Sequence, residues 1–245
     1  MDLANVERLS LQDLEEILRA AKDWGIAVVV IGGYAVRAHT RPRRFTKDID
    51  LALEKKSYGK LRGLLKSRGY SLREQPPRQS LWLSAKRRIG KDFIAIQAIK
   101  GQITDIGTGK VFKAGKSFFK DAKKMPAKAV LSPDLVVQAV VCSANDLLVM
   151  KLIPRRDKDL VDAATVLLDC WERLDAKKIL EKASESGLVP HIRQRLAELV
   201  EQIKQNRFKK TWRRVPETSG WRGMTLSDEK TIKSRAEELY KRLTA

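Results

Sequence analysis

The stretch that decides the fold is Ile26-Ala27-Val28-Val29-Val30-Ile31-Gly32-Gly33-Tyr34-Ala35. Its first six residues are apolar and mostly β-branched, which predicts a strand buried on both faces. The two glycines permit a sharp turn, and residues 34–39 can continue as a helix directly after it. We therefore expect a strand, a glycine turn and a helix as the first structural unit.

A second informative stretch, Lys47-Asp48-Ile49-Asp50-Leu51, follows a basic linker, Arg41-Pro42-Arg43-Arg44. Polar and apolar residues alternate from Asp48 onwards, as in a half-buried strand. Side chains two residues apart on a strand share a face, so Asp48 and Asp50 can converge on a divalent cation. Backbone N–H groups at a helix start after Gly32-Gly33 favour a bound phosphate. Each pattern alone is common, as a solvated strand face or a plain turn, but their order and spacing together predict a site for a nucleoside triphosphate and its metal.

At these residues the chain resembles the nucleotidyltransferase superfamily related to DNA polymerase beta. The signature of that superfamily is apolar-Gly-[Gly/Ser] followed by [Asp/Glu]-apolar-[Asp/Glu]-apolar. The form of residues 30–36, with Arg41, Arg44 and Thr46 before the acidic pair, looks most like the branch that includes AbiEii-type toxins. Downstream, residues 146–152 and 156–162 resemble the Lys motif and the Lys-Asp-x-x-Asp motif of that branch.

The resemblance implies nucleotidyl transfer with Mg²⁺ as cofactor. Lys151 would contact the triphosphate, and Asp159 would orient that lysine or assist the acceptor. Asp92 is the best candidate for a third carboxylate, although it can equally be the end of a turn. The implied site residues are Asp48, Asp50, Lys151 and Asp159 for catalysis, Gly32, Gly33, Arg44, Thr46 and Lys151 for nucleotide binding, and Asp48, Asp50 and Asp92 for the metal.

The expected fold class is α+β, with a small mixed or antiparallel sheet and flanking helices followed by a helical domain. Residues 1–130 would form the nucleotidyltransferase core, 131–205 the helical domain, and 206–245 a basic C-terminal segment with a terminal helix.

Four local features follow from capping and periodicity. A helix is expected to begin at Ser10, with Asp13 as its capping-box acid. Residues 100–128 are rich in Gly and Lys and are expected to be an irregular, partly extended connection. Ser132-Pro133 would open the first helix of the helical domain. Ser227 would cap the final helix.

The chain has 245 residues, and 50 Lys and Arg against 30 Asp and Glu give a net charge of +20. An excess of cations favours polyphosphate partners, because neutralising phosphates releases condensed counterions. The alternatives are a solvated Lys-rich surface and an acidic protein partner. Phe208, Trp212 and Trp221 lie among the cations of the tail, where they can stack on unpaired bases or pack the segment against the body.

Other site classes are disfavoured. The longest apolar run, Ile26–Ile31, is far shorter than the ~20 residues of a membrane span, and the N-terminus lacks a secretion signal, so we expect a cytoplasmic protein without a membrane partner. Two cysteines are too few for a disulfide framework. His39 and His191 are far apart in sequence and lack metal-ligand spacing, so both are expected to be structural.

The predicted function is Mg²⁺-dependent transfer of a nucleotide from an NTP to an acceptor, and the charge favours RNA such as tRNA. Two alternatives remain open. The acceptor can be a protein or a small molecule such as an aminoglycoside. The protein can also be a catalytically weak member that binds nucleic acid or an antitoxin-like partner.

Overall fold

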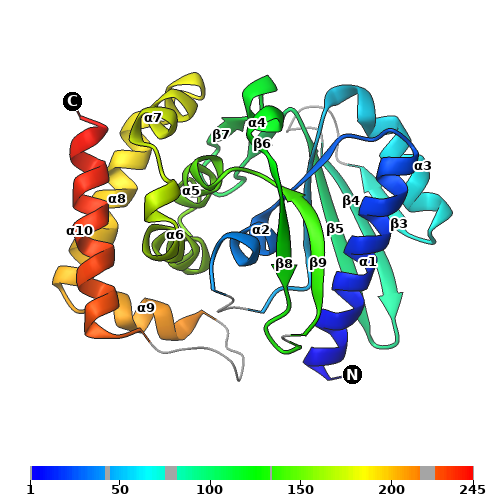
Figure 1. Cartoon of the computed structure of the whole chain (residues 1–245), viewed down its shortest axis with the longest axis horizontal. Coiled ribbons are helices and arrows are strands. Elements are labelled where there is room, and N and C mark those ends of the chain that lie inside the picture. The colour runs from blue at the N-terminus through cyan, green and yellow to red at the C-terminus, as the bar shows by residue number, and fades with distance from the viewer. Residues whose placement is uncertain (1, 42–44, 75–81, 133, 216–223, 245) are drawn as a thin grey trace. The chain divides into compact units, whose positions relative to one another are not determined.

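The structure, a computed structural model, describes residues 2–41, 45–74, 82–132, 134–215 and 224–244. The chain divides into two compact units (Figure 1). The first unit comprises Met1–Ala38, Phe45–Ile103 and Ala114–Ser143. The second comprises His39–Arg44, Thr104–Lys113 and Ala144–Ala245. None of the described helices is long and apolar enough to cross a membrane.

The first unit is built on a mixed seven-stranded sheet with the order β3-β4-β5-β2-β1-β9-β8. β1 is antiparallel to β2 and parallel to β9, and β2 is parallel to β5. The predicted α+β class is therefore confirmed. The strands are β1 (Val28–Ile31), β2 (Ile49–Leu53), β3 (Ser71–Glu74), β4 (Trp82–Ile89), β5 (Asp92–Lys100), β8 (Lys123–Lys128) and β9 (Val136–Val141).

Helix α1 (Leu3–Asp23) covers one face of this sheet and packs against α3 (Tyr58–Ser67) (Figure 1). The sheet side chains on that face include Ile49, Ile94 and Ile96, which are fully buried. Their neighbours along the strands alternate to the opposite face, as strand geometry requires. The two faces of β2 and β5 therefore differ, and Asp50 lies on the face away from α1.

The expected start of the first helix at Ser10 is wrong. Asp2 caps α1 by accepting a bond from the Ala4 N–H. Ser10 lies within the buried side of the helix, where its hydroxyl donates to the Lys47 carbonyl at 2.7 Å and accepts from the Tyr34 hydroxyl at 2.8 Å. Asp13 is equally buried and bonded to Tyr70 and Arg87. Ser10 and Asp13 thus have the spacing of a capping box, but their side chains bond to residues that are distant in sequence.

Residues 100–143 contain more regular structure than expected. β6 (Gln102–Thr104) and β7 (Val111–Lys113) form a separate two-stranded sheet, and α4 (Lys116–Asp121) and β8 follow. The helix expected to open at Ser132-Pro133 is also wrong, because Val136–Val141 is strand β9; Pro133 itself lies outside the described residues. Alternate residues of β9 are buried, so the core extends to Ser143 rather than ending at residue 130.

The second unit is helical, as predicted, and it includes the tail. α8 and α6 both pack against α10. Thr225, not Ser227, caps α10 through a capping box with Asp228. The helices are α5 (Ala144–Leu152), α6 (Asp157–Asp169), α7 (Ala176–Glu185), α8 (Val189–Lys204), α9 (Phe208–Arg214) and α10 (Leu226–Arg242), with short 3-10 turns η1 (Lys55–Ser57) in the first unit and η2 (Trp171–Arg173) in the second.

The tail aromatics serve the core of this unit. Phe208 and Trp212 are almost fully buried on α9, and their rings meet edge to face with centroids 6.0 Å apart. The idea that these two rings stack on bases is therefore wrong, and packing is their role. Trp221 lies outside the described residues.

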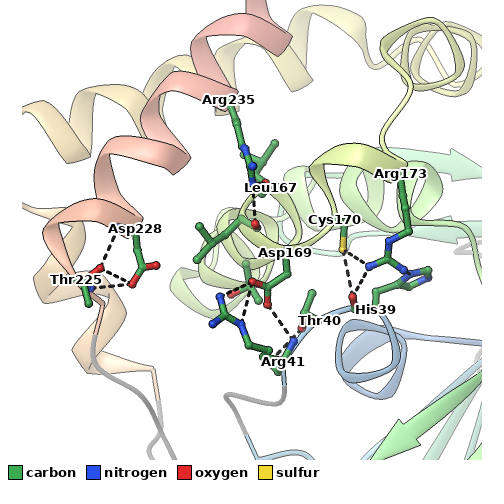
Figure 2. Close-up of polar contacts among 12 residues, drawn as sticks. His39, Thr40, Arg41, Leu167, Asp169, Cys170, Arg173, Thr225, Asp228 and Arg235 are labelled. Carbon is green, nitrogen blue, oxygen red and sulfur yellow. Dashed lines mark hydrogen bonds and ion pairs between the residues drawn. The ribbon is translucent and has the colours of Figure 1, made fainter.

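The segment that follows α2 (Gly32–His39) is attached to the C-terminal end of α6 (Figure 2). The Arg41 guanidinium and backbone N–H both donate to the Asp169 carboxylate, which raises the pKa of Arg41 above its usual value. Arg173 donates to the His39 carbonyl at 2.5 Å. Arg235 of α10 donates to the Leu167 and Leu168 carbonyls, which satisfies acceptors at the end of α6. The start of the basic linker is thus held within the second unit.

A buried ion pair in the first unit generates a stability prediction. Glu7 of α1 is fully buried, 2.6 Å from the Arg37 guanidinium, and also accepts from the backbone N–H groups of Val130 and Leu131. Glu7→Ala removes the carboxylate that neutralises the buried Arg37 guanidinium, so we expect a loss of about 3–5 kcal/mol in unfolding free energy. Urea denaturation measures it. The exposed Glu15→Ala on the same helix is the control, with an expected change below about 0.5 kcal/mol. Equal effects of the two variants would contradict the prediction.

Candidate active site

The glycine turn packs directly against the acidic strand. β1 ends at Ile31, which pairs with Asp50 across the antiparallel ladder. Gly32 follows with φ +65°, and a Cβ placed on it would lie 2.0 Å from Asp50 Oδ2 and 2.7 Å from its Cγ. Real atoms do not approach this closely. Glycine is therefore required at position 32 both by the backbone conformation and by the position of the carboxylate.

The second glycine faces another predicted site residue. A Cβ on Gly33 would lie 2.9 Å from both Cγ2 and Oγ1 of Thr46. Thr46 precedes the acidic strand, so both glycines of the turn lie against the segment that leads into and through β2. The structure thus brings Gly32, Gly33, Thr46 and Asp50 together.

Asp48 and Asp50 lie two residues apart where β2 begins, and both are partly exposed. Between and after them, Ile49 and Leu51 are fully buried on the α1 face. The alternation puts both carboxylates toward the opposite, open face. Hard oxygen donors in this arrangement suit a divalent cation that is also coordinated by phosphates.

Tyr34, the residue after the turn, is a structural anchor and not a proton acceptor. Its ring is fully buried and its hydroxyl donates to Ser10 of α1. Burial raises the pKa of the Tyr34 phenol well above its usual range, and the nearby Arg37 charge only partly opposes this. The phenol therefore stays protonated and fixes the start of α2 against α1.

The structure does not bring Asp92 to the acidic pair. In the parallel register of β2 and β5, Asp50 lies opposite Gln97, five residues beyond Asp92 along β5. Asp92 instead forms an ion pair with Lys47 at 3.7 Å. Among the described residues, no three His, Cys, Asp or Glu side chains are grouped closely enough to hold a metal. The register thus favours Gln97, and not Asp92, at the strand position beside Asp50.

The downstream motifs form a group of their own in the second unit. Lys151 of α5 lies 3.0 Å from Asp159 and 2.7 Å from Asp162, and all three side chains are nearly buried. Arg156 also donates to Asp159, at 2.6 Å. Asp162 is the last residue of the Lys-Asp-x-x-Asp match but was given no role from the sequence, although a three-residue spacing puts it on the same face of α6 as Asp159. Arg44 lies outside the described residues. Apart from Asp92, the predicted site residues that the structure describes lie in two local groups, one in each unit.

The histidines and cysteines have structural surroundings. His39 and His191 are buried, and each contacts a hydrogen-bonding partner within the second unit. Cys142 and Cys170 are buried free thiols.

The Gly32 contact gives a test of the turn geometry. Gly32→Ala and Gly69→Ala both place alanine at a positive φ, but only Gly32 has atoms in the way. We expect Gly69→Ala to cost about 1–2 kcal/mol of unfolding free energy and Gly32→Ala to cost about 1–3 kcal/mol more. Thermal or urea unfolding measures both. The excess should shrink in an Asp50→Ala background, which removes the two nearest atoms. An equal cost at both glycines would show that the turn does not press on Asp50.

Comparison with known proteins points to one class of enzyme. Residues 13–133 match the model of a family described as aminoglycoside-2''-adenylyltransferase. This span contains the glycine turn and the acidic strand, and it ends before β9 and all of α5 to α10. A search of curated proteins finds no significant match.

Solved structures share the fold. The crystal structure of JHP933 from Helicobacter pylori has 13% identity, covers 97% of this chain and 93% of its own, and gives a TM-score of 0.56. A candidate nucleotidyltransferase from H. pylori has 13% identity, covers 96% of each chain and gives the same TM-score. ANT(2'')-Ia in complex with adenylyl-2''-tobramycin has 15% identity, covers 71% of this chain and 95% of its own, with a TM-score of 0.46.

The two likenesses with a TM-score of 0.56 are low in identity and establish the fold alone. They do not support the AbiEii-type branch in particular. The class that was expected from the glycine turn and the acidic pair, an enzyme of the nucleotidyltransferase type, is the class to which the family match and the shared fold point.

Proposed function

We propose that this protein is a metal-dependent nucleotidyltransferase that moves a nucleotide from an NTP to an acceptor, with Mg²⁺ as the metal and RNA as the favoured acceptor. The observation that carries the proposal is the packing of the Gly32-Gly33 turn against Thr46 and Asp50. It brings the backbone N–H groups of a helix start and an acidic strand to one place. A triphosphate with its cation needs both kinds of group.

The donor set fits Mg²⁺. Proteins usually bind this ion through one or two carboxylates together with substrate phosphates, and Asp48 and Asp50 supply two on one strand face. When bound, the ion would neutralise phosphate charge, favour attack of the acceptor on the α-phosphate and stabilise the pyrophosphate that leaves. In this proposal the two aspartates hold the metal and the glycine turn binds phosphate. Thr46, which lies beside Gly33, helps to position that phosphate.

The acceptor must lose a proton in the reaction. Gln97, opposite Asp50, is not a base, so the third-carboxylate position cannot take that proton. It must pass to one of the two aspartates or to solvent. A site of this kind works mainly by positioning and by charge neutralisation, in keeping with phosphoryl-transfer chemistry in general.

Lys151 and Asp159 keep their proposed roles. The 3.0 Å bond from Lys151 to Asp159 supports an orienting role for the aspartate. Because Asp162 also contacts Lys151, the lysine has two negative partners before any triphosphate arrives. A contact with the triphosphate would therefore share or replace one of these partners.

Two acceptors have specific support. The family match favours an aminoglycoside, because that is the substrate in the family description. The net charge of +20 favours RNA, since aminoglycosides are themselves polycations and would be repelled. We give RNA priority because the net charge is a property of the whole chain, whereas the family match covers only residues 13–133. No observation on the described residues favours a protein acceptor or an antitoxin-like partner.

The acidic pair can be tested directly. With labelled NTPs, Mg²⁺ and total RNA, we expect Asp48→Asn and Asp50→Asn each to lower transfer by about 10²–10³-fold, because each removes a charge that holds the metal. Asp92→Asn is the matched control and should retain most activity, since Asp92 pairs with Lys47 instead. Labelling that survives both substitutions at the pair would contradict the proposal.

The acceptor can be tested in the same assay by offering RNA and an aminoglycoside separately and together. We expect labelled RNA, with a rate that falls steeply as salt is raised because phosphate contacts are screened. A labelled aminoglycoside and unlabelled RNA would instead establish the family's described substrate. Salt-dependent RNA binding without transfer to either acceptor would identify a catalytically weak member.

A further inference from the structure

We propose that the open face of β3, β4 and β5 is a binding platform for a single-stranded part of the RNA acceptor, with the Phe93 ring stacked on an unpaired base. The platform consists of Phe93 and the cations around it, Lys47, Lys86 and Arg88. This inference rests on the proposed function for its link to catalysis, but RNA binding at the platform can be measured without it.

The strand register places the platform on the same face as the acidic pair. Residues paired across neighbouring strands have side chains on one face, so Asp50 and Gln97 share a face. Phe93 lies four residues before Gln97 on β5, which keeps it on that face at a separation of about 13 Å along the strand. Arg88 of β4 pairs directly with Phe93.

The opposite face of the same strands is closed. Ile94 and Ile96 are fully buried, and Arg87 reaches Asp13 of α1 on that side. By contrast, Phe93 is 40% exposed, and Lys86 and Arg88 are exposed beside it. An exposed aromatic ring therefore lies on the same face of the sheet as the acidic pair.

Two lysine ammonium groups lie over the Phe93 ring, so a base that stacks on this ring would displace one of them. Lys47 Nζ and Lys86 Nζ lie 4.8 Å and 4.6 Å from the ring centroid. Lys47 also forms an ion pair with Asp92. Among the residues that the structure describes, no carboxylate forms an ion pair with Lys86 or Arg88. Their charge is thus available to an external anion.

This combination fits a single-stranded polynucleotide better than other ligands. Such strands are bound by an exposed ring that stacks on a base and by cations that follow the phosphates. A polycationic aminoglycoside would meet repulsion at Lys86 and Arg88. A duplex would hide its bases from Phe93, and an acidic peptide would use the cations without needing the ring.

The test compares ring and charge variants with matched controls. The probe is a fluorescent single-stranded oligouridine of about ten nucleotides, with binding to the full chain followed by anisotropy without NTP. Phe93→Leu removes the ring, and Phe93→Tyr keeps it. The control for ring loss is Trp24→Leu, since Trp24 is 45% exposed at the end of α1. The control for charge loss is Lys66→Gln on the exposed side of α3, compared with Lys86→Gln.

We expect Phe93→Leu to weaken oligouridine binding by about 5- to 100-fold, with Phe93→Tyr close to the parent. Lys86→Gln should weaken binding and lower the slope of log affinity against log salt by about 0.7. Both controls should bind like the parent. Unchanged binding in Phe93→Leu, an equal loss in Trp24→Leu, or equal competition by polyglutamate would overturn the platform.

The platform and the proposed function fail in different ways. Asp48→Asn should leave oligouridine binding unchanged. If Phe93-dependent binding is found but no nucleotide is transferred, the platform stands and the proposed activity is rejected. If RNA is labelled at the same rate by Phe93→Leu at limiting RNA, the activity stands and the platform is rejected.

Discussion

The approach of the Gly32 backbone to the Asp50 carboxylate is the constraint on which the rest of the first unit depends. An antiparallel pair of strands already brings Ile31 opposite Asp50, and the chain must then turn into a helix at once. Any side chain at position 32 would occupy the place of the carboxylate. The glycine turn, the start of α2 and the acidic strand β2 can therefore fold only together. Their arrangement also decides which face of the sheet is polar and which is apolar. The apolar side chains of β2 must face α1, because the polar ones face the turn.

Buried polar contacts hold α1 in register with the glycine turn and the acidic strand. Ser10 links α1 both to the Lys47 carbonyl, just before the acidic strand, and to Tyr34, just after the glycine turn. Apolar packing alone would leave α1 free to slide by a turn, whereas these bonds are satisfied in one position only. The second unit has comparable anchors in the contacts of Asp169 and Arg173 with the segment that begins at His39 (Figure 2). In both units these polar contacts are made to segments next to the predicted functional residues.

The sequence predicted the strand–turn–helix, the acidic strand and the helical second unit because these signals are local. A run of β-branched residues, two glycines and an alternating pattern are each complete within a few positions. The wrong predictions arise where the role of a residue is decided by a partner that is distant in sequence. Ser10 and Asp13 have the spacing of a helix cap, but Ser10 bonds to Tyr34, and Asp13 bonds to Tyr70 and Arg87. β9 was missed because a short apolar stretch fits helix and strand alike, and only pairing with β1 and β8 decides between them. Asp92 was chosen by its place at a strand start, whereas the register that puts Gln97 beside Asp50 cannot be inferred from one strand.

The position of Gln97 opposite Asp50, where a third carboxylate was expected, bears on the proposed acceptor. A site with two carboxylates carries less negative charge than one with three, so it repels a polyanionic acceptor less and attracts a polycationic one less. Beyond Gln97 the exposed charges on the same face of β3 and β4 are those of Arg73, Lys86 and Arg88, so the sign of the surface changes within a few residues of the acidic pair. A cation bound by Asp48 and Asp50 would reduce the remaining negative charge further. The exposed cations beside the acidic pair would then outweigh the remaining negative charge locally, which favours the approach of an RNA strand to the proposed site.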